Sequence, residues 1–207
     1  MEVLVEEPSM EAALRVLLPR LLGGTSFEVY RHQCKDDLLE KLPKRLQGYS
    51  AWLPVDWRIV VVVDRDNENC DCLKQRLEQI AADAGLRTRT AVGRGDYQVV
   101  NRLVIEELEA WYFGDWNAVR AAYPRVSDAI PRQANCRDPD AIRGGTWEAF
   151  ERLLQRVGYF RSGLRKIEAA RAVAEHWNPD VNRSHSFIIF RDVVREMIGS
   201  SVNDSSH

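Results

Sequence analysis

The segment Ile59–Val63 constrains the fold more than any other part of the chain. Its five residues are all apolar and β-branched, and polar residues flank the run on both sides. A strand with one face in water alternates polar and apolar residues, so an unbroken apolar run indicates a strand covered on both faces. We therefore expect an α/β fold, in which helices cover a mostly parallel sheet and this segment is a central strand.

Strand and helix patterns alternate around this segment. Further strands are predicted at residues 3–5, 27–30, 88–92 and 99–105, and helices at residues 8–22, 36–46 and 71–84. After residue 112 helical patterns dominate, at residues 116–123, 146–157, 164–177 and 187–198. The predicted organisation is an α/β core at 1–112, a helical extension packed on the core at 113–199, and a flexible tail at 200–207.

Charge and composition exclude some classes of protein. The 29 basic and 31 acidic residues give a net charge of −2, which argues against a strongly basic nucleic-acid coat protein and a polybasic membrane binder. The acidic N-terminus resembles no secretion signal, and no apolar run approaches the length of a membrane span. We expect a cytoplasmic protein without membrane contact, whose four cysteines are reduced.

Acidic residues follow three of the predicted strands. In parallel sheets the carboxyl ends of the strands share one edge, and ligands bind there. Carboxylates that are held together repel one another unless a cation neutralises them, and oxygen ligands select Mg²⁺ or Mn²⁺. Three acidic strand ends would supply enough ligands for two ions. The candidates are Glu6 and Glu7 after the first strand, Asp64, Asp66 and Glu68 after the central strand, and Glu106 and Glu109 after the last.

The helical half offers cations that suit a phosphate. Lys166 begins an amphipathic run, and Arg183 precedes the last helix. Both are candidates to contact a scissile phosphate, although Lys166 equally fits a solvated helix face.

Two motifs resemble the Toprim domain of topoisomerases, primases and OLD-type nucleases. Leu4-Val5-Glu6 followed by a helix looks like the Toprim glutamate, and Val62-Val63-Asp64-Arg65-Asp66 looks like the Toprim Asp-x-Asp. Many Toprim sequences have Gly after the glutamate. Glu7 stands there in this chain, so the choice between Glu6 and Glu7 as the catalytic residue stays open.

Most of the chain is also similar to an uncharacterised bacterial family, a domain of unknown function related to Toprim nucleases. The segments that carry this similarity are residues 4–9, 63–66, 106–111, 137–139 and 182–187.

The resemblance implies a Toprim/Rossmann-like sheet and Mg²⁺-dependent phosphodiester chemistry. In Toprim enzymes the two aspartates, here Asp64 and Asp66, hold the metal, and the glutamate is a ligand or a general acid/base. Lys166 would take the part of the lysine that assists catalysis in OLD-type nucleases. With no primase or topoisomerase accessory domain, the chain resembles a nuclease acting on DNA or RNA. By analogy it would serve in phage defence beside an ABC-like or OLD-like ATPase.

Two other functions fit the same residues. One is a phosphohydrolase in which Asp64 attacks phosphate and Asp66 is the acid/base, but that scheme normally places Asp-x-Asp after the first strand. The other is a non-catalytic or autoinhibited Toprim-like subunit that binds an ATPase. The intact Glu6, Asp64 and Asp66 argue against loss of catalysis but not against autoinhibition.

Overall fold

A four-stranded parallel sheet forms the centre of the molecule. The computed structural model describes residues 1–54, 56–65, 68–104 and 107–203. The strands are β1 (Glu2–Val5), β2 (Glu28–Arg31), β3 (Ile59–Asp64) and β4 (Val99–Val104), in the spatial order β2-β1-β3-β4. All three pairings are parallel, which confirms the predicted α/β class.

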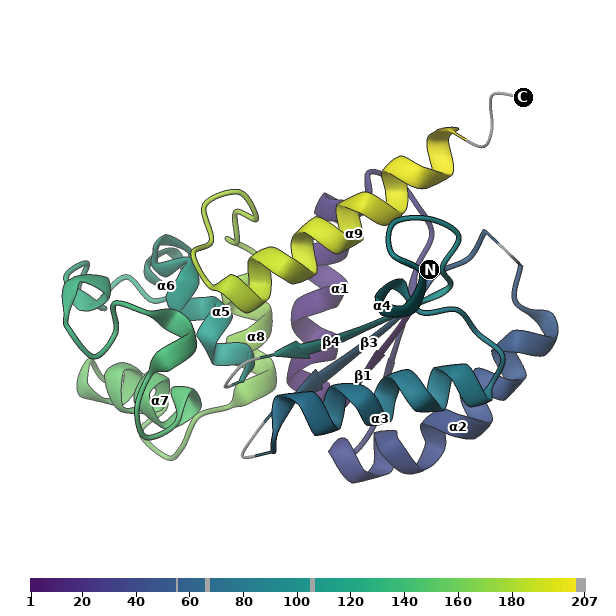
Figure 1. Cartoon of the computed structure of the whole chain (residues 1–207). Coiled ribbons are helices and arrows are strands. Elements are labelled where there is room, and N and C mark those ends of the chain that lie inside the picture. The colour runs from purple at the N-terminus through teal and green to yellow at the C-terminus, as the bar shows by residue number, and fades with distance from the viewer. Residues whose placement is uncertain (55, 66–67, 105–106, 204–207) are drawn as a thin grey trace.

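The strand β3 is buried along its whole length, as its sequence predicts. Ile59, Val61 and Val63 face a core under α2 (Lys35–Trp52) and α3 (Cys70–Asp83). Val60 and Val62 face the opposite core, under α1 (Pro8–Leu22) and α9 (His185–Asn203). The sheet is thus sandwiched between two helical layers (Figure 1).

Local sequence sets the ends of these helices. Pro8 stands in the first turn of α1, where its missing N–H costs nothing, and Gly23 ends the helix with a φ of 55°. Asn69 starts α3 because its side chain accepts hydrogen bonds from the backbone N–H groups of Asp71 and Cys72.

The strand predicted at residues 88–92 is wrong. Thr88 alone forms a bridge, to Val99, and the chain then turns into the short helix α4 (Arg89–Val92). The Thr88 hydroxyl accepts a hydrogen bond from Ala91 N at 3.2 Å, so the β-branched residue acts as a helix cap instead of continuing a strand. Gly93, with a φ of 72°, ends the turn.

The helical half shares its core with one face of the sheet. Its elements are α5 (Leu108–Gly114), α6 (Trp116–Ala122), the short 3₁₀ turns η1 (Ile130–Arg132) and η2 (Pro139–Ala141), α7 (Thr146–Arg156) and α8 (Lys166–Ala174). The helix α8 packs along α1, and the division predicted at 112/113 lies inside α5. The last helix, α9, continues to Asn203, beyond the predicted end at residue 198, and residues 204–207 lie outside the described part.

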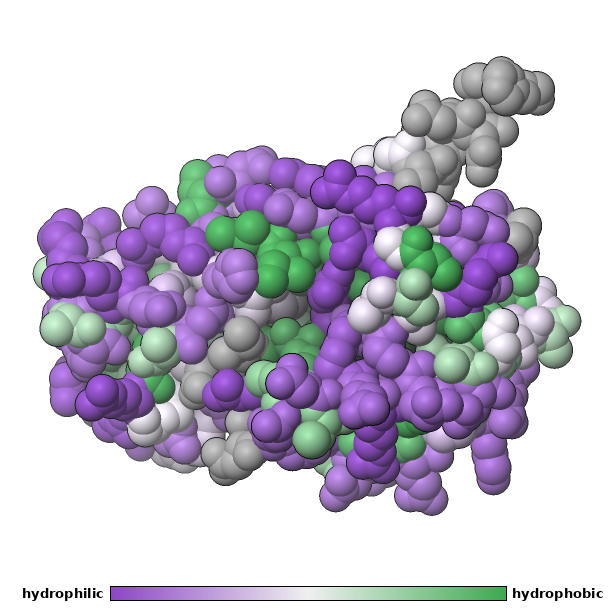
Figure 2. All heavy atoms as spheres, in the orientation of Figure 1, coloured by the Kyte–Doolittle hydropathy of each residue, from purple (hydrophilic) through white to green (hydrophobic). Residues whose placement is uncertain are grey.

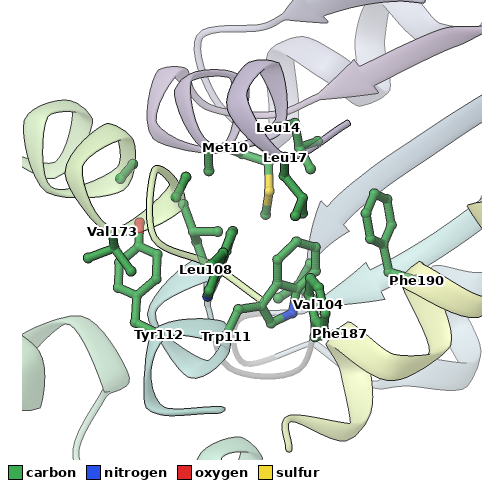
Figure 3. Close-up of a cluster of buried hydrophobic side chains, with 14 of the residues drawn as sticks. Met10, Leu14, Leu17, Val104, Leu108, Trp111, Tyr112, Val173, Phe187 and Phe190 are labelled. Atoms are coloured by element: carbon green, nitrogen blue, oxygen red, sulfur yellow. The ribbon is translucent and has the colours of Figure 1, made fainter. Parts of the chain in front are cut away.

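Trp111 lies at the junction of these layers (Figure 3). Its ring is 5.2 Å from that of Phe187 and 5.1 Å from that of Phe190, centroid to centroid, so α5 is fixed against α9. Around this core the surface is largely hydrophilic, with some hydrophobic side chains gathered over the first half of α9 (Figure 2). No helix in the described ranges is both long and apolar enough to cross a membrane.

Candidate active site

The carboxyl ends of β1, β3 and β4 place acidic residues along one edge of the sheet. Val5 is paired with Val62 and Asp64 with Val104, so the three strands end at similar heights. Glu6 and Glu7 follow β1, Asp64 is the last residue of β3, and Glu109 lies in the first turn of α5. The parallel topology therefore brings these acids to the same edge.

Glu6 and Asp64 are both buried, whereas Glu7 is partly exposed. Glu7 precedes α1, and its carboxylate accepts a hydrogen bond from the Ser9 hydroxyl. Beside Glu6 and Glu7 the surface opens into a cleft of about 360 Å³ that is also lined by Lys35 and Glu68. Glu6 and Glu7 thus border a space that substrate could enter.

Glu109 is the most deeply buried acid of this edge, with 1% of its surface exposed. Its Oε2 atom has no hydrogen-bond partner among the described residues. Burial raises the pKa of Glu109 to about 8, against the pull of the Lys166 ammonium and with a further contribution from Glu7 and Glu107. A buried carboxyl group in this state either keeps a proton or requires a cation.

Lys166 is a cation whose charge acts on these acids. It is the first residue of α8, and its Nζ atom lies 5.1 Å from the centroid of the Trp147 ring. Burial lowers the pKa of Lys166, but the neighbouring carboxylates outweigh burial and the net shift is upward. The carboxylates that produce this rise are those of Glu109, Glu7, Glu107 and Asp64. Lys166 therefore stays charged, and it interacts electrostatically with acids from three segments: the start of α1, the end of β3 and the start of α5.

Glu107 has a structural contact that the sequence did not reveal. Its carboxylate accepts hydrogen bonds from the Thr146 hydroxyl at 2.9 Å and from Trp147 N at 3.0 Å, at the start of α7. Burial raises the pKa of Glu107, and these two hydrogen bonds oppose the rise. Glu107 thereby fixes α7, and with it Trp147, beside Lys166.

Tyr112 is a second residue of the site that sequence reasoning missed. It lies three residues after Glu109, so both side chains share a face of α5. Its hydroxyl is buried without a hydrogen-bond partner in the part of the chain that the structure describes. Burial, followed by the charges of Glu109 and Glu7, raises the pKa of Tyr112 well above its ordinary value. The i, i+3 spacing from a candidate acid is the signal that could have found it.

Of the four other candidates, two lie outside the described residues, one lines the cleft and one has no contact with the acids in the part of the chain that the structure describes. Asp66 and Glu106 fall outside the described residues. Glu68 is exposed at the cleft and accepts a hydrogen bond from Lys35 Nζ at 3.2 Å. Arg183 is also exposed, and its backbone N–H donates to the carbonyl of Gly114 at 3.0 Å. The carboxyl edge of the sheet therefore brings together Glu6, Glu7, Asp64 and Glu109. Lys166 interacts electrostatically with three of them, and no contact among the described residues adds Arg183.

Comparison with known protein families identifies the family of this chain. A sequence model described as a domain of unknown function, DUF4276, covers residues 5–197. The chain belongs to the DUF4276 family. No curated protein and no solved structure matches it.

Asp140 links two segments of this DUF4276 chain that lie far apart in the sequence, the turn η2 and the start of α9. Its carboxylate accepts hydrogen bonds from the hydroxyls of Ser184 and Ser186, at 2.9 and 2.8 Å, and from the backbone N–H of His185. The Ser184 hydroxyl in turn accepts a hydrogen bond from Phe187 N at 3.2 Å, so Ser184 is the N-cap of α9. These residues hold α9 in place and contribute no acid to the sheet edge.

The donor set of the DUF4276 site suits a hard cation in type. Carboxylate oxygens are what Mg²⁺ and Mn²⁺ take, and the buried Oε2 of Glu109 is an acceptor that such an ion would satisfy. Within residues 1–54, 56–65, 68–104 and 107–203, however, no group of three or more His, Cys, Asp or Glu side chains is close enough to hold an ion. The described carboxylates alone therefore do not form a complete ligand shell, and Asp66 and Glu106 lie outside the described residues.

Proposed function

We propose that this DUF4276 chain is a Toprim-like nuclease that uses Mg²⁺ or Mn²⁺ to hydrolyse phosphodiester bonds in DNA or RNA. The observation that carries the proposal is Lys166 among the carboxylates of Glu7, Asp64 and Glu109 at the carboxyl edge of a parallel sheet. Acids alone would bind a cation. Acids beside a lysine that keeps its positive charge can bind a metal cation and a phosphate group together.

The roles follow from burial and charge. Asp64 and Glu109, with Asp66, would hold the cations, and Glu6 or Glu7 at the cleft would take the proton of the attacking water. When bound, two such ions activate the water and stabilise the leaving oxygen. Lys166 would hold a non-bridging phosphate oxygen, because its charge is retained and its position is fixed against Trp147.

Phage defence beside an ABC-like or OLD-like ATPase remains part of the proposal. It is supported by the resemblance of Glu6 and the Asp64-Arg65-Asp66 segment to the Toprim motifs of OLD-type nucleases. An ATPase partner would also account for a nuclease whose acids are largely buried in the isolated chain.

The test combines metal binding with cleavage. Purified protein is titrated calorimetrically with Mg²⁺ and Mn²⁺, then incubated with plasmid, single-stranded DNA and tRNA, with and without a candidate ATPase. The site variant is Asp64→Asn combined with Asp66→Asn. Asp83→Asn, an exposed acid on α3, is the matched control.

We expect the double variant to lose both metal binding and cleavage, while the control keeps both. Cleavage that persists in the double variant refutes the assignment of the metal site. Metal binding without cleavage under any condition, with the ATPase present, favours the non-catalytic subunit instead.

A further inference from the structure

A basic pocket lies beside the edge strand of the sheet, formed by β4, α4 and α9. It has a volume of about 460 Å³ and is lined by Arg89, Arg94, Arg102, Ile189, Asp192, Val193 and Glu196. None of these residues belongs to the candidate active site. Three of its lining residues are arginines, although the net charge of the chain is −2.

Arg102 is the residue that the fold explains least. In β4 the side chains of Val100 and Val104 enter the core under α1 and α9, and the alternation of a strand places Arg102 between them on the same face. Its Nε atom is buried without a hydrogen-bond partner among the described residues. Burial lowers the pKa of Arg102, and the charge of Arg89 adds to this. An unsatisfied, partly buried guanidinium is costly for the free protein.

The acids of the pocket are already engaged by other groups. Glu196 accepts two hydrogen bonds from Arg89, at 2.9 and 2.8 Å, and one from the Tyr97 hydroxyl at 3.1 Å. Asp192 is paired with Arg191, with a shortest N–O distance of 2.7 Å. Two acids and two arginines thus neutralise each other, which leaves a positive excess on the remaining pair.

That remaining pair is Arg94 and Arg102. The Arg94 side chain is 84% exposed, and its Nε lies 3.5 Å from Glu196, so it can turn towards a ligand at little cost. Arg102 is partly buried and fixed in β4. One partly buried guanidinium and one exposed guanidinium that line the same pocket are well suited to an anion with several acceptor oxygens.

We propose that the pocket between β4, α4 and α9 binds a phosphate group through Arg102 and Arg94. Tetrahedral phosphate can accept from both guanidiniums at once. The aliphatic side chains of Ile189 and Val193 form the apolar part of the lining and would contact the organic portion of a phosphate ester. The source of the group is either a small phosphate compound or the backbone of a nucleic acid, and the binding chemistry is the same.

The test measures binding in EDTA, so that the acidic site and its cations do not contribute. Inorganic phosphate, adenosine 5′-monophosphate and a 12-residue single-stranded oligonucleotide are titrated calorimetrically, with chloride at matched ionic strength as the reference. The variants are Arg102→Gln and Arg94→Gln. Arg76→Gln, an exposed arginine on α3, is the control.

We expect saturable phosphate binding that weakens about ten- to hundredfold in Arg102→Gln and stays unchanged in Arg76→Gln. Without ligand, Arg102→Gln should melt at or above the wild-type temperature, because an unsatisfied charge is removed. If Arg102→Gln does not fold, Arg94→Gln tests the proposal instead. The Arg94 side chain is exposed, so this variant should fold normally and bind phosphate more weakly.

Tighter binding of the mononucleotide than of the oligonucleotide assigns the pocket to a small phosphate compound, and the reverse order assigns it to a nucleic-acid backbone. Equal affinity of wild type and both pocket variants overturns the proposal. So does an equal loss in Arg76→Gln, which would indicate unspecific charge attraction.

Discussion

Replacing the buried Glu109 by Gln tests the electrostatics of the acidic edge directly. Glutamine has nearly the shape of a protonated carboxyl group, so the substitution fixes the neutral form of a residue that is 1% exposed. The pKa of Glu109 is about 8 in the folded protein and 4.5 as a free side chain. Between these values the unfolded chain is ionised at this position while the folded protein holds the proton.

The sign of the effect follows from proton linkage. The folded-state pKa is raised, so the contribution of Glu109 to stability is fully present below pH 4.5 and is lost as the pH rises towards 8. One pKa unit corresponds to about 1.4 kcal/mol, so the loss is about 2 kcal/mol at pH 6 and about 5 kcal/mol at most above pH 8. Glu109→Gln escapes this loss and becomes more stable than wild type as the pH rises.

Urea unfolding in EDTA at several pH values between 4.5 and 8.5 measures the difference in the free energy of unfolding between Glu109→Gln and wild type. Glu40→Gln, an exposed acid on α2, is the control and should follow wild type throughout. If the free energies of unfolding of Glu109→Gln and wild type differ by the same amount across this pH range, the pKa of Glu109 is not raised in the folded protein. If Glu109 is also a metal ligand, adding Mg²⁺ at pH 8 stabilises wild type but not Glu109→Gln.

Four further substitutions test other parts of the structure. Asp140→Ala removes the acceptor of three hydrogen bonds at the start of α9 and should lower the free energy of unfolding by about 2–4 kcal/mol in urea titrations; an unchanged midpoint would contradict this role. Gly114→Ala would place a Cβ atom 1.9 Å from Asn182 Oδ1 and should cost about 1–3 kcal/mol in thermal unfolding. In contrast, Gly48→Ala within α2 meets nothing within 4 Å and should stabilise the protein by about 1 kcal/mol. Lys166→Met keeps the packing against Trp147 but removes the charge, so cleavage should fall by about a hundredfold or more while the fold, followed by circular dichroism, persists.

The sheet could be predicted because its signals are local. The continuous apolar run of Ile59–Val63 indicates a strand buried on both faces, and the alternation with helices indicates parallel pairing. The strand predicted at residues 88–92 is wrong because Thr88 is β-branched, as strand residues often are, yet its hydroxyl caps α4. Nothing in the local pattern separates these two uses of a β-branched residue.

The candidate site was predictable only in part, for a related reason. Acids after strands are visible in the sequence, and the parallel topology brings Glu6 and Asp64 to one edge. The proximity of Lys166 to Glu109 depends on how α8 packs on α1 and α5 on α7, which no spacing rule specifies. The same holds for Glu107, whose hydrogen bonds to the start of α7 link positions about forty residues apart.

The strand β4 connects the two inferred sites, and it does so with buried groups of opposite charge. Arg102 lies on its core face and Glu109 follows its end, and each has a buried polar atom without a hydrogen-bond partner in the described ranges. Arg102 stays charged at every accessible pH, so its replacement by Gln should alter stability by a nearly constant amount. The gain from Glu109→Gln instead grows with pH, because it comes from a carboxyl group that loses its proton near pH 8. If both residues were only architectural, the chain would be more stable without either charge and would lose no ligand. Two binding sites are therefore distinguished from two packing defects by what each variant loses. Arg102→Gln should lose phosphate binding alone, and Glu109→Gln should lose stabilisation by Mg²⁺ alone.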